Sequence, residues 1–207
     1  GIHHHLDSLN LYYWKDGREL LSDLGYLWDH PDSRQTRRTA AHNLVMIDGQ
    51  EQRTKGRGGS FHLFAATPRV KVAEASSAAY KQASLYRRTC VQIDHGQAGS
   101  YLVDVFRVRA HAGGRKDARC QYVFHGPGND FDLQGLKLVA ATDGAELALD
   151  SARVGPGDAP WQISWRVDKD YRFTAFSPGA RGETVMLGNG WGQRDHRNRD
   201  RGAVLPY

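Results

Sequence analysis

Residues 9–22 read LNLYYWKDGRELLS, which is two alternating apolar runs on either side of an Asp-Gly pair. An Asp-Gly dipeptide between alternating runs is a strong short-range signal for a β-hairpin. We therefore predict a strand before Asp16-Gly17 and another after it. This hairpin would bring residue 23 back to the end of the strand pair at which the first strand begins.

Three candidate metal ligands lie around this hairpin. His5 precedes it, Asp23 follows it, and His42 stands just before the apolar run 44–47. Folding the hairpin would bring His5 and Asp23 to one end of the strand pair, and His42, at the start of the next strand, could complete the site. Two imidazoles and one carboxylate suit zinc, with a fourth position left for water or another residue.

Ordinary structural roles are also open to these residues. The three consecutive histidines at 3–5 could be the remainder of a purification tag, although residues 6–9 lead directly into a patterned strand. Asp23 could form a strand-end turn, and His42 could be a histidine satisfied by hydrogen bonds at a strand start.

The rest of the chain favours an all-β fold. It has 23 glycines, five tryptophans and nine tyrosines, and it shows no long apolar stripe at helical spacing. We expect one domain over residues 1–207, a two-layer antiparallel β-sandwich. Further strands are predicted at 61–64, 69–72, 85–93, 101–109, 120–125, 136–139, 161–167, 171–176 and 184–187.

Three of these runs, 85–93, 101–109 and 120–125, predict a meander of neighbouring strands. Cys90 and Cys120 would then lie two strands apart, about 9–10 Å, which is too far for a disulfide. We expect both to be buried small side chains.

Asp104 falls on an apolar strand face in the same region and needs a buried partner. Arg87 or Arg88 on the neighbouring strand could supply it. A contact with substrate is the alternative for this carboxylate.

The formal net charge is +5, from 28 Lys plus Arg against 23 Asp plus Glu, and such an excess attracts polyanions. Arginine clusters occur at 34–38 and at 194–201, and arginine forks bind carboxylate or sulfate oxygens. Arg38 is our candidate substrate contact from the first cluster. The second cluster could equally well be part of a solvated loop that binds nothing. No run approaches the ~20 apolar residues that cross a membrane. Nucleic acid is one possible polyanion, and an acidic polysaccharide is another.

Two further residues could reach a cleft. His125 stands in His125-Gly126-Pro127-Gly128, which could equally be a strand-end turn, and Trp191 could stack on a sugar ring or cap the edge of the sandwich. The sequence shows neither a Ser-His-Asp set nor a reactive cysteine motif, which argues against a self-contained hydrolase.

Several motifs in order resemble the heparinase II/III-like polysaccharide lyases, an architecture shared with alginate exolyases and oligoalginate lyases. They are the segments HHHLD at 3–7, DLG at 23–25, AHNLVMIDGQ at 41–50, YLVDVFRV at 101–108 and YVFHG at 122–126. The resemblance covers most of the chain. It implies strand and loop over 73–84, where intrinsic propensity alone favours helix.

Carried over by position, the resemblance implies zinc ligands at His5, Asp23 and His42, because the family pattern reads His-x-His-x-Asp and its second histidine binds the metal. It places His3 at the sugar-binding cleft as the catalytic residue of this segment. It also implies a periplasmic or secreted protein whose partner is an acidic polysaccharide or oligosaccharide, and neither nucleic acid nor a membrane.

Family members carry a large α/α toroid before this region, which supplies most groups that bind the uronate and move its protons. We therefore expect this chain to be the C-terminal β domain, with the toroid as a covalent or nicked partner, and to be inactive alone. The complete protein would cleave a uronic-acid polymer, alginate or a glycosaminoglycan, by β-elimination, with this domain as one wall of the cleft. The alternative is a non-catalytic carbohydrate-binding or interface sandwich that docks on a separate chain.

Overall fold

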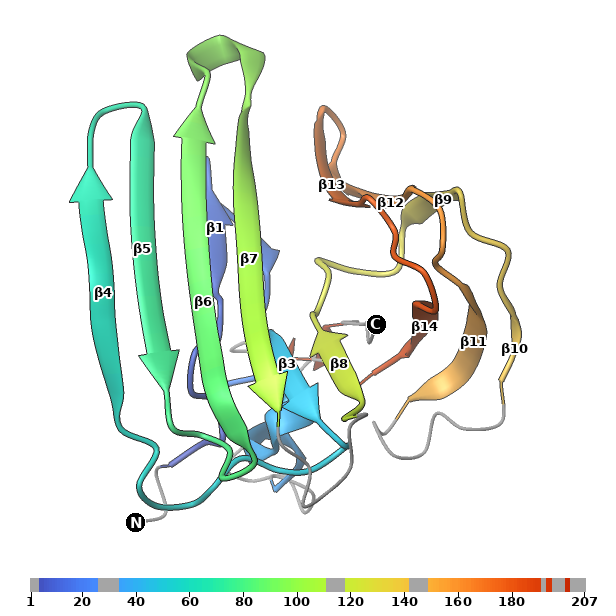
Figure 1. The fold of residues 1–207 in the computed structure, drawn as a ribbon. Coiled ribbons are helices and arrows are strands. Elements are labelled where there is room, and N and C mark those ends of the chain that lie inside the picture. Colours follow the sequence, from blue (N-terminus) through green and yellow to red (C-terminus); the bar gives the residue numbers. More distant parts are fainter. Residues whose placement is uncertain are drawn as a thin grey trace.

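A computed structural model describes residues 4–25, 34–110, 118–141 and 149–190, and the backbone of two short strands, β15 (Gln193–Arg194) and β16 (Asp200–Arg201). Antiparallel sheets make up most of this part of the chain (Figure 1). Its helical elements are the short 3-10 turns η1 (Gln35–Arg37), η2 (Thr39–Ala41) and η3 (Gly96–Ala98). The predicted all-β sandwich is confirmed. None of the helices in these ranges is long and apolar enough to span a membrane.

The largest sheet has four strands in the order of the chain: β4 (Gly59–Ala66), β5 (Val70–Ser77), β6 (Ala83–Asp94) and β7 (Ser100–Ala110). Exposure alternates residue by residue along β7, as expected for a strand with one covered face. Strand rather than helix over most of 73–84 is also confirmed, because β5 extends to Ser77 and β6 begins at Ala83.

The second layer is built from two three-stranded sheets. One has the order β13 (Tyr171–Ser177), β12 (Trp161–Asp168), β9 (Phe131–Gln134), and the other the order β10 (Val139–Ala140), β11 (Asp150–Pro156), β14 (Thr184–Asn189). Residues 168–170 connect β12 and β13, which match two of the predicted strands, in a hairpin. β11 has no counterpart among the predicted strands, because its segment lacks a clear period-two pattern.

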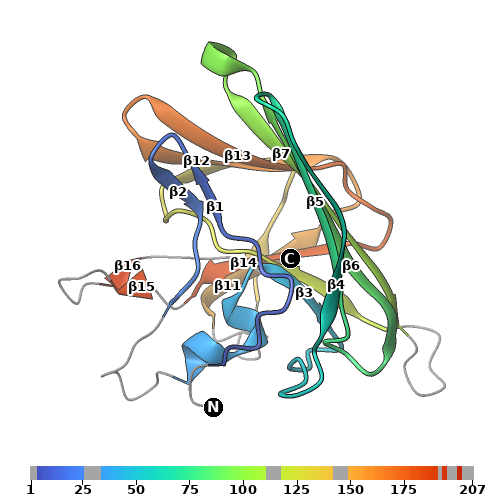
Figure 2. The same cartoon turned by 90° about the vertical axis from the view of Figure 1, so that its left-hand side faces the viewer.

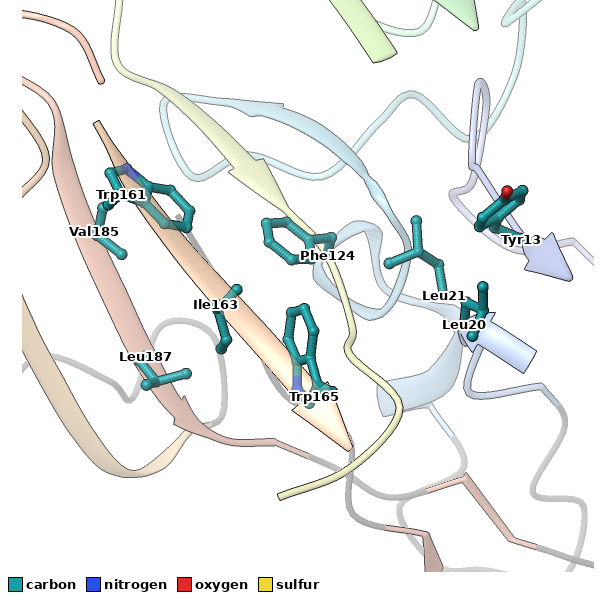
Figure 3. Close-up of a cluster of buried hydrophobic side chains, with 9 residues drawn as sticks. All are labelled: Tyr13, Leu20, Leu21, Phe124, Trp161, Ile163, Trp165, Val185 and Leu187. Atoms are coloured by element: carbon teal, nitrogen blue, oxygen red, sulfur yellow. The ribbon is translucent and has the colours of Figure 1, made fainter. Parts of the chain in front are cut away.

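The main apolar core joins the second layer to the N-terminal hairpin (Figure 3). Trp165 of β12 is 1% exposed, stacks on Phe173 at 5.6 Å between ring centroids, and meets Phe124 edge-on at 6.3 Å. Gly126 packs so closely against the Trp165 ring that an added Cβ would lie 2.4 Å from Cε2. The other buried members are Tyr13, Leu20, Leu21, Trp161, Ile163, Val185 and Leu187.

The predicted meander is wrong in its third strand. β8 (Cys120–Val123) pairs antiparallel with β3 (Leu44–Ile47) and not with β7. Alternation indicates that a run is a strand and which residues share a face, but it does not identify the neighbouring strand. The cysteines are free, as expected, but Cys90 is half-buried and Cys120 is exposed, which corrects the expectation that both are buried.

Seen after a quarter turn, the four-stranded sheet stands edge-on opposite the N-terminal hairpin and β12–β13 (Figure 2). Ion pairs link these parts: Lys15 Nζ lies 2.6 Å from Asp94 of β6, and Arg18 Nε lies 2.6 Å from Asp168 at the end of β12. The hairpin therefore bridges the two layers.

Candidate metal centre

The N-terminal hairpin forms as predicted. β1 (Tyr13–Lys15) pairs with β2 (Arg18–Leu21), and the two turn residues have positive φ, 52° at Asp16 and 74° at Gly17. Positive φ at both central residues is the requirement of a type I′ turn, which Asp-Gly meets at low cost. The hairpin returns the chain to its start, where Asn10 Nδ2 donates a hydrogen bond to Asp23 Oδ2 at 2.7 Å.

The predicted ligands converge at this end of the hairpin. One candidate ligand atom from each of His5, Asp23 and His42 lies within 4.8 Å of the other two. The two imidazole centroids are 5.3 Å apart. His42 is inaccessible to solvent, His5 is 8% exposed and the Asp23 side chain 22%, so the cluster is buried with one partly open side.

Asp23 is held by three hydrogen-bonding contacts. Its Oδ2 lies 2.7 Å from His42 Nδ1 and accepts from Asn10, and its Oδ1 accepts from the Gly25 amide at 2.8 Å. Burial raises the pKa of this carboxyl, but the hydrogen bond and positive charge of His42, with the Gly25 amide, outweigh burial, so the pKa of Asp23 lies below its usual value. Asp23 is therefore a carboxylate at neutral pH, which is the form that binds a cation.

His5 is positioned mainly through its backbone. Arg57 Nη1 donates to the His5 carbonyl at 2.7 Å, and the next amide, of Leu6, donates to the Arg37 carbonyl at 3.0 Å. Burial, followed by the charge of His42, lowers the pKa of the His5 imidazole. The neutral imidazole, which is the ligand form, is thereby favoured.

Asn43, which the sequence interpretation did not single out, connects the segments behind the ligands. Its Nδ2 donates to the carbonyls of Leu11 and Ser22 at 2.8 and 2.7 Å, and its Oδ1 accepts from the His125 amide at 2.6 Å. Its own amide donates to Asn10 Oδ1 at 2.8 Å. One sequence signal could have identified Asn43: it is an uncharged polar residue that directly follows a candidate ligand and directly precedes a wholly apolar strand.

Arg88 joins the four-stranded sheet to the same region. Its guanidinium binds both oxygens of Asp104, at 2.8 and 2.7 Å, and also contacts the Tyr122 hydroxyl at 2.7 Å. Nη1 donates to the carbonyls of Leu9 and Asn43 at 2.7 and 2.5 Å. The expected buried partner of Asp104 is thus Arg88, and the pair braces the backbone next to Asn10 and His42.

His125, a predicted substrate contact, lies behind the ligand cluster and is 6% exposed. Its Nδ1 lies 3.2 Å from Asn43 Oδ1. Burial, with the nearby charge of His42, lowers the pKa of His125 to about 4, so it is neutral at neutral pH. In this structure its side chain supports Asn43, and contact with substrate stays a prediction.

The other predicted site residues are placed as follows. Arg38 follows η1 and donates through Nε to Glu51 Oε1 at 2.8 Å, while Glu51 Oε2 accepts from the Thr39 amide at 2.6 Å. Its guanidinium is therefore engaged with a carboxylate. His3 and Trp191 lie outside the described residues.

The chemistry of the donor set fits a bound cation. His42 Nε2 is buried and has no hydrogen-bond partner among the described residues, which is costly unless another group satisfies it. Two imidazoles and an ionised carboxylate are ligands that zinc accepts, and Asn10 and Asn43 fix their surroundings as outer-shell partners do.

The fold and this cluster define a class: an all-β domain with a candidate metal site of two histidines and one aspartate. The family profile described as Heparinase II/III-like, C-terminal, matches residues 1–172. The chain belongs to this family.

Solved structures agree on the fold. A heparinase III gene product matches with a TM-score of 0.53 and 13% identity over 98% of this chain and 36% of its own. The heparan sulfate lyase HepC from Pedobacter heparinus matches with a TM-score of 0.50 and 12% identity over 99% of this chain and 31% of its own. The chain thus spans about a third of their length. A comparison with curated protein sequences gave no match.

Proposed function

We propose that this chain is the β module of a polysaccharide lyase that cleaves a uronic-acid-containing polymer by β-elimination. The observation that carries the proposal is the family match over residues 1–172, and the likeness of the fold to heparinase structures supports it. The reaction removes the C5 proton of the uronate and expels the C4 oxygen, so it requires a base, an acid and a group that neutralises the carboxylate.

In this proposal a zinc ion held by His5, Asp23 and His42 organises the wall of the cleft. When bound, it supplies fixed positive charge that ties the N-terminal segment to the hairpin end and to η2. The protein's own residues do the rest: Asn10 and the Gly25 amide orient the Asp23 carboxylate, and Asn43 fixes the strand start beside His42. Neighbouring His3, two residues before a ligand, would face the sugar.

This segment cannot supply the complete chemistry. His3 is the one residue to which the family resemblance assigns a catalytic role, and one imidazole cannot neutralise the carboxylate, remove the proton and protonate the leaving oxygen at once. General acid–base groups contribute about 10²–10⁴-fold each. We therefore propose that the chain acts together with a preceding domain, the α/α toroid of the family, and is inactive without it.

The test is an ultraviolet assay for the unsaturated uronate product. The complete polypeptide should cleave at least one of heparan sulfate, hyaluronan and alginate, and the 207-residue chain alone none of them. His3→Ala in the complete polypeptide should lower turnover by at least 10²-fold, while His95→Ala, an exposed histidine between β6 and η3, should leave it unchanged. Strong elimination by the isolated chain would show that the active site has been misplaced.

A second candidate, carbohydrate binding without catalysis, is favoured by one exposed aromatic pair. Tyr12 and Trp14 are 46% and 52% exposed, with ring centroids 6.1 Å apart. Exposed aromatic faces of this kind can bind sugar rings. Oligosaccharide binding that quenches Trp14 fluorescence, with no product from the complete polypeptide, would favour this function.

The proposed substrate is anionic, in keeping with the net charge of +5. The family resemblance further supports a periplasmic or secreted location, where such polymers occur. Fractionation of the native cells tests the location directly.

A further inference from the structure

The four-stranded sheet is wider than the layer packed on it. On the covered face of β6, Tyr86 is 2% and Arg88 5% exposed. Register carries the same face through Ala75, which pairs with Arg88, to Phe61 of β4, which pairs with Ala75. Phe61 is nevertheless 82% exposed. The face that is buried under β6 and β7 is therefore open at β4, and Figure 1 shows β4 and β5 lying away from the second layer.

A β-bulge directs a second phenylalanine to this face. Phe64 pairs with Ala73, and Phe61 with Ala75, because the register shifts between Phe61 and Leu63. Residues three apart in a regular strand would point to opposite faces, and the extra residue of the bulge, His62, brings the two rings to the same one. Phe64 is 77% exposed. Small alanines across the strand pair leave both rings prominent.

β4 also lacks the usual protection of an edge strand. Its sequence, GSFHLFAA, contains no Lys, Arg, Asp, Glu or Pro, although a quarter of the whole chain is charged. Natural edge strands usually carry such residues because they discourage unwanted contacts. An uncharged edge strand with two phenylalanines on one face is typical of a surface that another part of the protein covers.

His5, near the beginning of the described residues, lies close to the first residues of β4. Arg57, two residues before β4, donates to the His5 carbonyl at 2.7 Å, and its own carbonyl accepts from Ser77 Oγ at 2.8 Å. Ser77 pairs with Gly59, the first residue of β4. At about 3.4 Å per residue along a strand, and with the bulge residue not counted, Phe61 and Phe64 lie roughly 7 and 14 Å along β4 from that point. A domain joined ahead of residue 4 would therefore emerge beside them.

We infer that Phe61 and Phe64, with Ala73 and Ala75 beneath them, form the docking surface for the domain that precedes this chain in the complete polypeptide. This inference rests on the proposed function, since the matched structures are about three times as long and the matched family describes a C-terminal part. The uncharged strand calls for an apolar counterpart on that domain. Docking there would also place the preceding domain next to His5 and the candidate metal centre.

Cysteine accessibility in the complete polypeptide tests the surface. In a Cys120→Ser background, Phe64→Cys is compared with Phe176→Cys on β13, because Phe176 is similarly exposed at 66%. Cys90 does not interfere near neutral pH, since burial, followed by the charge of Asp104, raises the pKa of its thiol to about 11. We expect maleimide to modify position 64 at least tenfold more slowly than position 176.

Two results would overturn the inference. Equal rates at positions 64 and 176 would show that the surface is open. Position 64 could also react slowly at high protein concentration and quickly on dilution. If sedimentation showed a matching change from dimer to monomer, the occupant of the surface would be a second copy of the chain. Lyase activity is scored separately on the same variants, so protection of position 64 without elimination would retain the docking surface and reject the proposed function.

Discussion

The clusters around Trp165 and around Asn43 are both buried, but they hold the chain together by different means. Trp165 packs among apolar and aromatic side chains, including the rings of Phe124, Phe131 and Phe173, where shape and area decide the contact. Asn43 is 0% exposed and uses directed hydrogen bonds to segments near residues 10, 22 and 125. The first cluster stabilises the fold mainly through buried apolar area and ring packing, and the second fixes polar atoms where a ligand could use them.

Because of this difference, substitutions in the two clusters should change different properties of the protein. Loss of volume in the apolar cluster should lower the free energy of unfolding whether or not a metal is bound. Changes in the polar cluster should act through protonation and metal affinity, because its members are titratable or bind titratable groups.

The largest effect is expected from Trp165→Ala. Removal of this ring leaves a cavity beside Phe124, Phe173 and Gly126. Aromatic-to-alanine changes in cores cost about 3–5 kcal/mol, and urea unfolding should show a loss of that size with or without zinc. Phe176→Ala, at an exposed ring, should change stability by less than about 0.5 kcal/mol. A similar loss of unfolding free energy in Trp165→Ala and Phe176→Ala would show that the buried ring stabilises the fold no more than the exposed one.

Acid should weaken the polar cluster next. The pKa of His125 is lowered to about 4 by burial and by the charge of His42, against 6.5 when unfolded. The unfolded state therefore binds the proton first, and stability is lost as pH falls from about 6.5 to 4. The difference corresponds to about 3 kcal/mol. Urea unfolding of metal-free protein across this window measures it.

His125→Gln supplies the control for that measurement. Glutamine keeps a neutral polar side chain but does not titrate, so the pH slope of the variant between 6.5 and 4 should be smaller. A slope remains from His5, whose pKa is also lowered by burial. Asp23 contributes below this window, because its pKa lies under the usual carboxyl value and its stabilisation is lost only as pH falls through that lower pKa. Identical slopes in the two proteins would remove His125 from the buried network.

The hairpin and the cluster of three candidate ligands were predictable because their signals are local: Asp16-Gly17 sets the turn, and the turn brings residues 5 and 23 together. The pairing of β8 with β3 was not, since strand partners depend on contacts distant in sequence. Asn43 was missed for a similar reason, because its role appears only when three separate segments surround it. Arg88 was one of two candidates for Asp104, and alternation from one residue to the next decides between them.

Removal of a ligand should abolish metal stabilisation. We expect one zinc per wild-type chain after dialysis, and a gain of about 2.7 kcal/mol in unfolding free energy when free zinc is 100 times the dissociation constant. His42→Ala should bind no zinc and gain nothing. His62→Ala, on the exposed strand β4, is the matched control and should behave as wild type. Metal analysis and urea unfolding with and without zinc give the two readouts, and equal zinc in the two variants would reject the ligand assignment.

The smallest effect is expected at Asn10, which contacts the candidate ligand Asp23 and is not itself a candidate ligand. Its Nδ2 donates to Asp23 Oδ2 and its Oδ1 accepts from the Asn43 amide, so it orients a ligand without being one. Loss of such an outer partner typically weakens metal binding by about 10–100-fold. Asn10→Ala should show a decrease of this size in a chelator competition, while Asn189→Ala, at the exposed end of β14, should show none. If Asn10→Ala binds zinc as tightly as wild type, the Gly25 amide and His42 alone are sufficient to hold Asp23, and the directed network around Asn43 contributes to folding rather than to the metal centre.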